Sequence, residues 1–309
     1  MKNIIFTVLI YGITFTSFSQ DYFNVNEEYP CQGCVNYSAD FNSQKKYTKE
    51  KINSVFDSIV NSGIEFNYPQ GGCQNRAQIM SMYLTKKHNI EHSRIWLFAP
   101  IDLVKGDKRT LFISDKNNLT DKIEWNYHVA PSVLVKNGAI VDTLVIDPSI
   151  NSKKPLKVKE WLDAIGNSNI SKYTYLKSDY YFFYTQDNGA STVINGFFYK
   201  YEKTSFCTDI ITDVTLEKGL AENDMVIYIL NKYLKSAPNE QFELFKKYYG
   251  NVTTLQNKYM SKLGFCGQTV QDNVAFRTII EDYPNILADS MKYYYERLIY
   301  WTEIVNKLK

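Results

Sequence analysis

The sequence predicts an α+β fold in which helices pack on an antiparallel sheet. Residues 52–60 and the segment that begins at Cys73 carry apolar side chains at helical spacing. Strands are predicted by runs rich in β-branched and aromatic residues at 94–98, 110–113, 124–135 and 139–146. A helix followed by several strands on short loops is an α+β arrangement.

The remaining elements can be placed in order. The first helix should end near Gly63, and the second opens at Cys73 and ends in Lys86, Lys87 and His88, which suit a helix C-terminus. A short helix over 158–165 and aromatic-rich strands over 173–184 complete a first domain, predicted to span residues 45–187.

Residues 188–309 are predicted to form a second, mainly helical domain. After a Tyr- and Phe-rich strand or loop, helices are expected over 225–234, 240–249 and 286–308. In the last helix, apolar residues recur at alternating spacings of four and three, at Leu287, Met291, Tyr294, Leu298, Trp301, Val305 and Leu308. We expect this domain to pack on itself or on the first.

The N-terminus has the features of a secretory signal, residues 1–20. Lys2 precedes the apolar stretch 4–15 and a small-residue region that ends at Gln20. Residues 21–44 would then form an N-terminal arm, and the protein would be secreted or periplasmic. No later run is long enough for a membrane span, so no integral membrane segment is expected after signal removal.

The charge balance argues against nucleic acid as the partner. The chain has 35 basic and 33 acidic residues, a formal net charge of +2. Nucleic-acid binders carry a strong basic excess. A near-neutral surface suits a protein substrate or a small molecule.

Five cysteines in an exported chain leave one unpaired, and Cys73 is the natural free thiol. The other four could form two disulfides of undetermined connectivity: Cys31, Cys34, Cys207 and Cys266. A redox pair at Cys31 and Cys34, or a zinc site with the other two, is less favoured. That segment lacks the strand-to-helix context of a thioredoxin motif.

A predicted hairpin connects a histidine to an aspartate. Asn137-Gly138 lies between two β-branched runs, and this pair favours a type I′ turn. If Asn137 and Gly138 are the two loop residues, the residue numbers of each pair across the hairpin add up to 275. His128 then lies opposite Asp147. Opposed Cβ atoms are about 4.5–5.5 Å apart, within reach of a hydrogen bond. Pro131 could shift this register by forming a bulge.

Cys73, His128 and Asp147 therefore have the residue types of a nucleophile, its base and the group that orients the base. Gly71 and Gly72 allow a tight turn before the helix, and a helix N-terminus favours a thiolate. The plainer alternatives are a buried cysteine, a structural histidine and an Asp-Pro turn.

The other two histidines form a His-x-x-x-His spacing, His88 and His92. They lie across a predicted helix end and lack an acidic partner of the metalloprotease type, so metal binding there is not expected.

Three motifs in order resemble the bacterial protein-glutaminase family. They are Asn67-Tyr68-Pro69 with Gly72-Cys73-x-x-Arg76-Ala77, then Trp125-x-Tyr127-His128-Val129-Ala130, then Ile146-Asp147-Pro148-Ser149. Enzymes of this family deamidate glutamine side chains within proteins and have a papain- or transglutaminase-like core. The resemblance covers residues 45–185.

The resemblance implies that Cys73 is the nucleophile, His128 the base and Asp147 the orienting acid, without metal or cofactor. It implies a glutamine-bearing protein or peptide as substrate, with a thioester intermediate and ammonia release. Substrate contacts are assigned to Gly72, Trp125, Tyr127 and Ser149. Strand alternation nevertheless points Trp125 and Tyr127 away from His128, as wall or core.

The chain departs from the family in several places. Gln74-Asn75 follows the cysteine where an aromatic-small pair is expected, and Gln78 replaces a more usual histidine. We expect the large pro-region of the resembled enzymes to be absent. These departures concern substrate preference and zymogen control rather than the chemistry.

Other functions stay open. The same triad could serve a transglutaminase or a cysteine protease. The chain could instead be a non-catalytic partner-binding protein. The C-terminal domain could also cover the site as an inhibitory lid.

Overall fold

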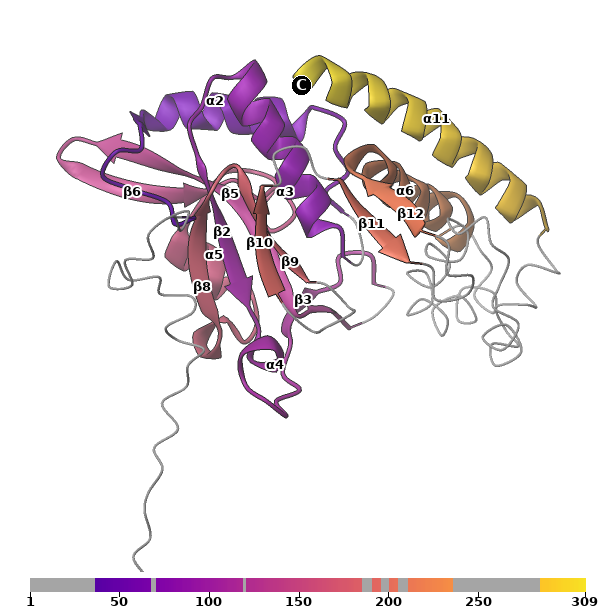
Figure 1. Ribbon diagram of the computed structural model, residues 1–309, viewed down its shortest axis with the longest axis horizontal. Coiled ribbons are helices and arrows are strands. Elements are labelled where there is room, and N and C mark those ends of the chain that lie inside the picture. The colour runs from indigo at the N-terminus through magenta and orange to yellow at the C-terminus, as the bar shows by residue number, and fades with distance from the viewer. Residues whose placement is uncertain are drawn as a thin grey trace, which may run out of the picture. The chain divides into compact units, whose positions relative to one another are not determined.

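The computed structural model describes residues 37–67, 71–118, 121–184, 191–195, 200–204, 211–235 and 284–309. Within this part of the chain, a six-stranded sheet has the order β7-β6-β5-β2-β8, and β1 pairs with β5. The bounds are β1 Lys46–Tyr47, β2 Ser93–Phe98, β5 Tyr127–Asn137, β6 Ile140–Val145, β7 Leu156–Lys157 and β8 Lys172–Lys177. All pairings are antiparallel except that of β1 with β5. The predicted mixture of helices with an antiparallel sheet is confirmed (Figure 1).

Three two-stranded sheets complete the strands of the described residues. They are β3 (Leu111–Ser114) with β4 (Lys122–Trp125), β9 (Tyr180–Tyr184) with β10 (Ser191–Asn195), and β11 (Lys200–Thr204) with β12 (Ile211–Thr215). The prediction of one continuous strand over 124–135 is wrong. The chain breaks at Asn126, whose carbonyl accepts from the Ala99 amide, so β4 and β5 belong to different sheets.

The predicted hairpin forms, but with another register. Asn137 pairs with Ile140 and Ser132 with Val145, so partner numbers sum to 277 rather than 275. The turn residues are Gly138, with φ of 62°, and Ala139. Because the shift is two residues, every side chain keeps its face of the sheet.

The first helices follow the expected pattern. Helix α2 (Lys49–Val60) begins at Thr48, whose hydroxyl accepts from the Lys51 amide at 3.2 Å, a usual N-cap. Helix α3 (Cys73–Met82) continues as the π-helix η1 (Tyr83–Lys87).

The later helices are α4 (Pro100–Leu103), α5 (Val158–Asp163), the 3₁₀ helix η2 (Ser168–Ile170), α6 (Leu216–Ile229), the π-helix η3 (Leu230–Leu234) and α11 (Pro284–Leu308). The helix predicted over 225–234 thus begins nearer the N-terminus, at Leu216. The expected helix over 240–249 and the signal segment lie outside the described residues.

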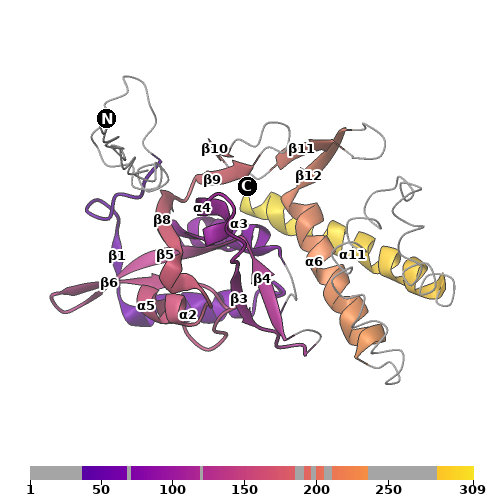
Figure 2. The ribbon, with the colours of Figure 1, turned by 90° about the horizontal axis from the view of Figure 1, so that it is seen from below.

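Two apolar clusters flank the sheet. One joins β5 and β6 to α2, α3, α6 and α11, and the other fills the space between the sheet and α5. Helix α11 packs along α6 (Figures 1 and 2). Asp224 of α6 accepts from Arg297 and from the Trp301 indole of α11, each at 2.6 Å.

Residues 37–309 group into one compact unit by their contacts. The predicted domain boundary at residue 188 stays a prediction. In the described ranges, no helix has the length and apolar character needed to cross a membrane.

Candidate active site

Cys73 lies at the first position of α3 and is 4% exposed. Gly71 and Gly72 before it have φ of 74° and 70°, in the left-handed region that favours glycine. This pair turns the chain sharply, so that the helix opens at the cysteine. The expected tight turn before Cys73 is therefore present.

His128 and Asp147 form a buried pair. His128 Nε2 is 2.8 Å from Asp147 Oδ2, and the residues are 2% and 5% exposed. In the observed register Ala130 is the position opposite Asp147, and His128 is its neighbour on the same face. The contact between His128 and Asp147 therefore runs diagonally across the two strands. It lies one residue beyond Ile146, whose amide donates to the Pro131 carbonyl.

Two further donors hold the Asp147 carboxylate. The Ser149 hydroxyl donates to Oδ1, and the Trp161 indole donates to Oδ2 at 2.9 Å. Ser149 was expected to contact substrate, but in the structure its hydroxyl is used on Asp147. The carboxylate is thereby oriented by three different side chains.

The imidazole of His128 stacks with two indole rings. The centroid distance is 5.3 Å to Trp125 and 5.6 Å to Trp161, and both interplanar angles are 20°. Such faces attract a cationic ring. The expectation that Trp125 points away from His128 is wrong, because the break at Asn126 ends the alternation of side chains.

Sequence reasoning missed Trp161. Its only local signal is its position in the short helix that follows the loop of Asp147. Nothing in the spacing of these residues shows that α5 folds back onto the end of β6. This contact depends on the core cluster that contains Trp161, which is fully buried.

Opposing effects set the pKa of the histidine. Burial alone disfavours the imidazolium, but the charge of Asp147, its hydrogen bond and the Cys73 thiol raise the pKa of His128 to about 9. Burial likewise opposes ionisation of Asp147, yet the charge of His128 and three hydrogen bonds hold its pKa below the usual range. The pair is therefore an ion pair at neutral pH.

The Cys73 thiol lies close to the imidazole of His128. Nδ1 of His128 is buried and forms no hydrogen bond in the described part of the chain, although the thiol is near enough to affect the imidazole. Cys73 Sγ is 3.6 Å from Gln74 Oε1 and 4.0 Å from the Tyr127 carbonyl.

The other predicted substrate residues differ in their surroundings. The Tyr127 ring packs on Trp96 and Phe98, with centroid distances of 5.7 and 6.4 Å, as wall or core. A Cβ on Gly72 would lie 2.7 Å from the Asn223 carboxamide of α6, so only glycine fits there. The C-terminal part of the chain thus contacts the turn that carries Cys73.

A second contact of α6 supports this arrangement. A Cβ on Gly219 would lie 2.4 Å from Nδ2 of Asn75, which is on α3. Asn75 stands where the family motif has a small residue. Its side chain packs against Gly219, which lies one helical turn before Asn223. Helix α6 therefore approaches the N-terminus of α3 closely at two points.

Neither His88 nor His92 forms a hydrogen bond or ion pair with Cys73, His128 or Asp147 in the described part of the chain. His92 is buried with Nδ1 3.1 Å from the Ile90 carbonyl, and burial lowers its pKa to about 4. Among the described residues, no group of three or more His, Cys, Asp or Glu side chains is placed to hold a metal ion. Cys73 is a free thiol, and the other four cysteines lie outside the described residues, so their disulfides stay a prediction.

A cysteine at a helix N-terminus beside an oriented, protonated histidine is chemically suited to acyl transfer through a thioester. The comparison with family models is more specific, because the model of a glutaminase family matches residues 45–165. These residues include Cys73, His128 and Asp147. This match supports the resemblance seen in the sequence for that part of the chain.

Solved protein-glutaminase structures are also similar. A crystal structure of pro-protein-glutaminase is 24% identical, with 48% of this chain and 53% of that chain covered and a TM-score of 0.37. The NMR structure of protein-glutaminase from Chryseobacterium proteolyticum is 20% identical, with 63% and 95% covered and a TM-score of 0.42. A crystal structure of protein-glutaminase is 20% identical, with 63% and 96% covered and a TM-score of 0.39. The chain thus spans about half of the pro-protein-glutaminase chain, and no curated protein sequence matches it.

Proposed function

We propose that this chain is a protein-glutamine deamidase, which converts glutamine side chains of proteins or peptides to glutamate and releases ammonia. The observation that carries the proposal is the buried His128-Asp147 pair beside Cys73, within the region that matches the glutaminase family. We include in the proposal a papain- or transglutaminase-like core and export of the protein.

The first half-reaction would form a thioester. The Cys73 thiolate attacks the γ-carboxamide carbon, and the carbonyl electrons move to oxygen. Backbone N–H groups, that of Cys73 among them, would hold the oxyanion. When the tetrahedral intermediate collapses, the C–N bond breaks and His128 gives its proton to the departing ammonia.

The second half-reaction would hydrolyse the thioester. His128, now neutral, takes a proton from water, and the hydroxide attacks the thioester carbon. Collapse of this intermediate breaks the C–S bond, which leaves glutamate and regenerates the Cys73 thiolate with the imidazolium. Each turnover consumes one water and needs no metal or cofactor.

The raised pKa of His128 supports its role as an acid. Because this pKa is about 9, the imidazole is protonated at neutral pH and can donate to ammonia. We expect the rate to fall as the pH rises through this value, because deprotonated His128 has no proton to give.

The test is to incubate the mature protein with a glutamine-containing peptide and follow ammonia release and peptide mass. Cys73→Ala is the matched control. Conversion of amide to acid that disappears in the control supports the proposal. An intact peptide, a cleaved peptide or a crosslinked peptide contradicts it, and the last two indicate a protease or a transglutaminase.

A further inference from the structure

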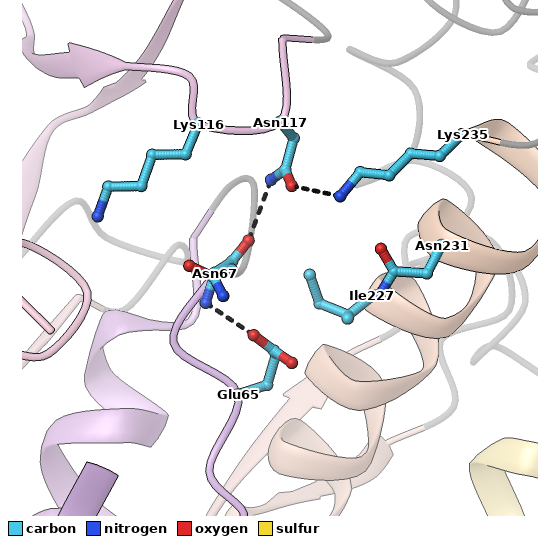
Figure 3. Close-up of a pocket in the computed structure, with 7 residues that line it drawn as sticks. All are labelled: Glu65, Asn67, Lys116, Asn117, Ile227, Asn231 and Lys235. Carbon is cyan, nitrogen blue, oxygen red and sulfur yellow. Dashed lines mark hydrogen bonds between the residues drawn. The ribbon is translucent and has the colours of Figure 1, made fainter.

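A polar cavity of about 260 Å³ lies between the loop that leads to the nucleophile, the loop after β3 and the end of the α6–η3 helix. Its walls carry three asparagines, two lysines and a glutamate: Asn67, Asn117, Asn231, Lys116, Lys235 and Glu65. Figure 3 shows Glu65, Asn67, Asn117, Asn231 and Lys235 around one opening, from which the Lys116 ammonium points away. The buried Ile227 adds an apolar patch to the wall.

A chain of hydrogen bonds organises the cavity. Lys235 Nζ donates to Asn117 Oδ1 at 3.1 Å, and Asn117 Nδ2 donates to the Asn67 carbonyl at 3.1 Å (Figure 3). The Asn67 amide donates to Glu65 Oε1 at 2.8 Å. The side chains from three segments are thus connected before any ligand arrives.

Lys235 is the cation that faces the cavity. Its ammonium donates to a neutral amide oxygen, whereas the ammonium of Lys116 extends away and donates to the Ser149 carbonyl at 2.7 Å (Figure 3). Over the part of the chain that the structure describes, neither lysine forms an ion pair. Glu65 already accepts from the Asn67 amide, so the charge of Lys235 favours a carboxylate of a ligand.

Helix α6 connects the cavity to the nucleophile turn. Gly219, Asn223, Ile227, Asn231 and Lys235 recur every fourth residue, so each lies about one turn from the next along the helix. The first two contact Asn75 and Gly72, and the last three line the cavity. At about 1.5 Å per residue, Asn223 to Asn231 spans about 12 Å and Asn223 to Lys235 about 18 Å.

We propose that this cavity binds an acidic side chain of the protein substrate, four or five residues from the target glutamine. An extended peptide advances about 3.3 Å per residue, so about four or five residues cover the distance along α6. The asparagine carboxamides can both donate and accept hydrogen bonds. They are therefore suited to bind the peptide main chain next to the acidic side chain. The inference rests on the proposed deamidation, because that activity places the target glutamine at Cys73. Binding of the acidic side chain can nevertheless be measured without turnover.

The experiment uses the Cys73→Ala variant of the full chain and fluorescent peptides with blocked termini. Paired peptides carry Glu or Ser at the fourth or fifth position on either side of glutamine, so that the members of a pair differ by one negative charge. At low salt we expect the Glu peptide to bind about two- to fivefold more tightly by anisotropy. This preference should shrink as salt is added, because the charges are exposed.

Lys235→Gln should remove the preference, and Lys235→Glu should reverse it. Lys159→Gln is the control, because Lys159 is an exposed lysine on α5 and its loss changes the net charge equally. With active protein, the Glu peptide should have the lower KM and an unchanged kcat. Equal binding of both peptides, or a preference that survives in Lys235→Gln, overturns the proposal even if deamidation is observed. Charge-dependent binding without deamidation supports the cavity assignment and contradicts the proposed activity.

Discussion

Replacing Asp147 by Asn should produce a loss of stability that depends on pH. The substitution keeps the shape of the side chain but removes the charge that opposes the burial of the His128 imidazolium. The pKa of His128 is raised from 6.5 to about 9, and each pKa unit corresponds to about 1.4 kcal/mol. The ion pair therefore contributes about 3 kcal/mol to the free energy of unfolding where both groups are charged.

The sign of the pH dependence follows from the direction of each shift. A histidine with a raised pKa stabilises the fold fully below its unfolded value of 6.5, and this contribution is lost as the pH rises to about 9. The pKa of Asp147 is lowered, so the same interaction is lost as the pH falls below its usual value of 3.8. The window of full stabilisation lies between these two unfolded-state values.

Urea unfolding followed by circular dichroism at about pH 5.5 and about pH 9.5 measures this effect. Asp147→Asn should cost about 3 kcal/mol at the lower pH and much less at the higher. Ser149→Ala is the control, because it removes one hydrogen bond without removing charge and should cost about 1 kcal/mol at both pH values. An equal loss for Asp147→Asn at both pH values would refute the assignment of an ion pair.

The surroundings of the pair give two further predictions. Trp161→Phe keeps an aromatic ring on the imidazole but removes the donor to the carboxylate, so we expect a loss of about 1–3 kcal/mol in urea unfolding, and a lower kcat with little change in KM. If kcat is unchanged, the Trp161 N–H has no part in orienting the Asp147 carboxylate. Gly72→Ala should cost about 1–3 kcal/mol more than Gly71→Ala, because only at Gly72 does the new Cβ meet the Asn223 carboxamide, whereas nothing lies within 4 Å at Gly71. Equal stabilities of these two variants would show that the contact with α6 relaxes freely.

The hairpin shows how far local pattern can predict this site. The turn signal placed two β-branched runs side by side and put His128 near Asp147, which the structure confirms. The register was wrong by two residues because the turn uses Gly138 and Ala139. The side-chain period of a strand is two, so an error of two leaves both side chains on the expected face.

The sequence by itself determined the tight turn before Cys73, the approximate positions of most described helices and strands, and the resemblance to a family. These features depend on neighbouring residues: glycine permits positive φ, and apolar spacing selects a helix or a strand. Only the tertiary structure decided that Trp125 and Trp161 stack on the imidazole and that α6 lies on Gly72. Those contacts join segments far apart in the chain. They form because large apolar surfaces are buried together, and no local spacing encodes which surfaces meet.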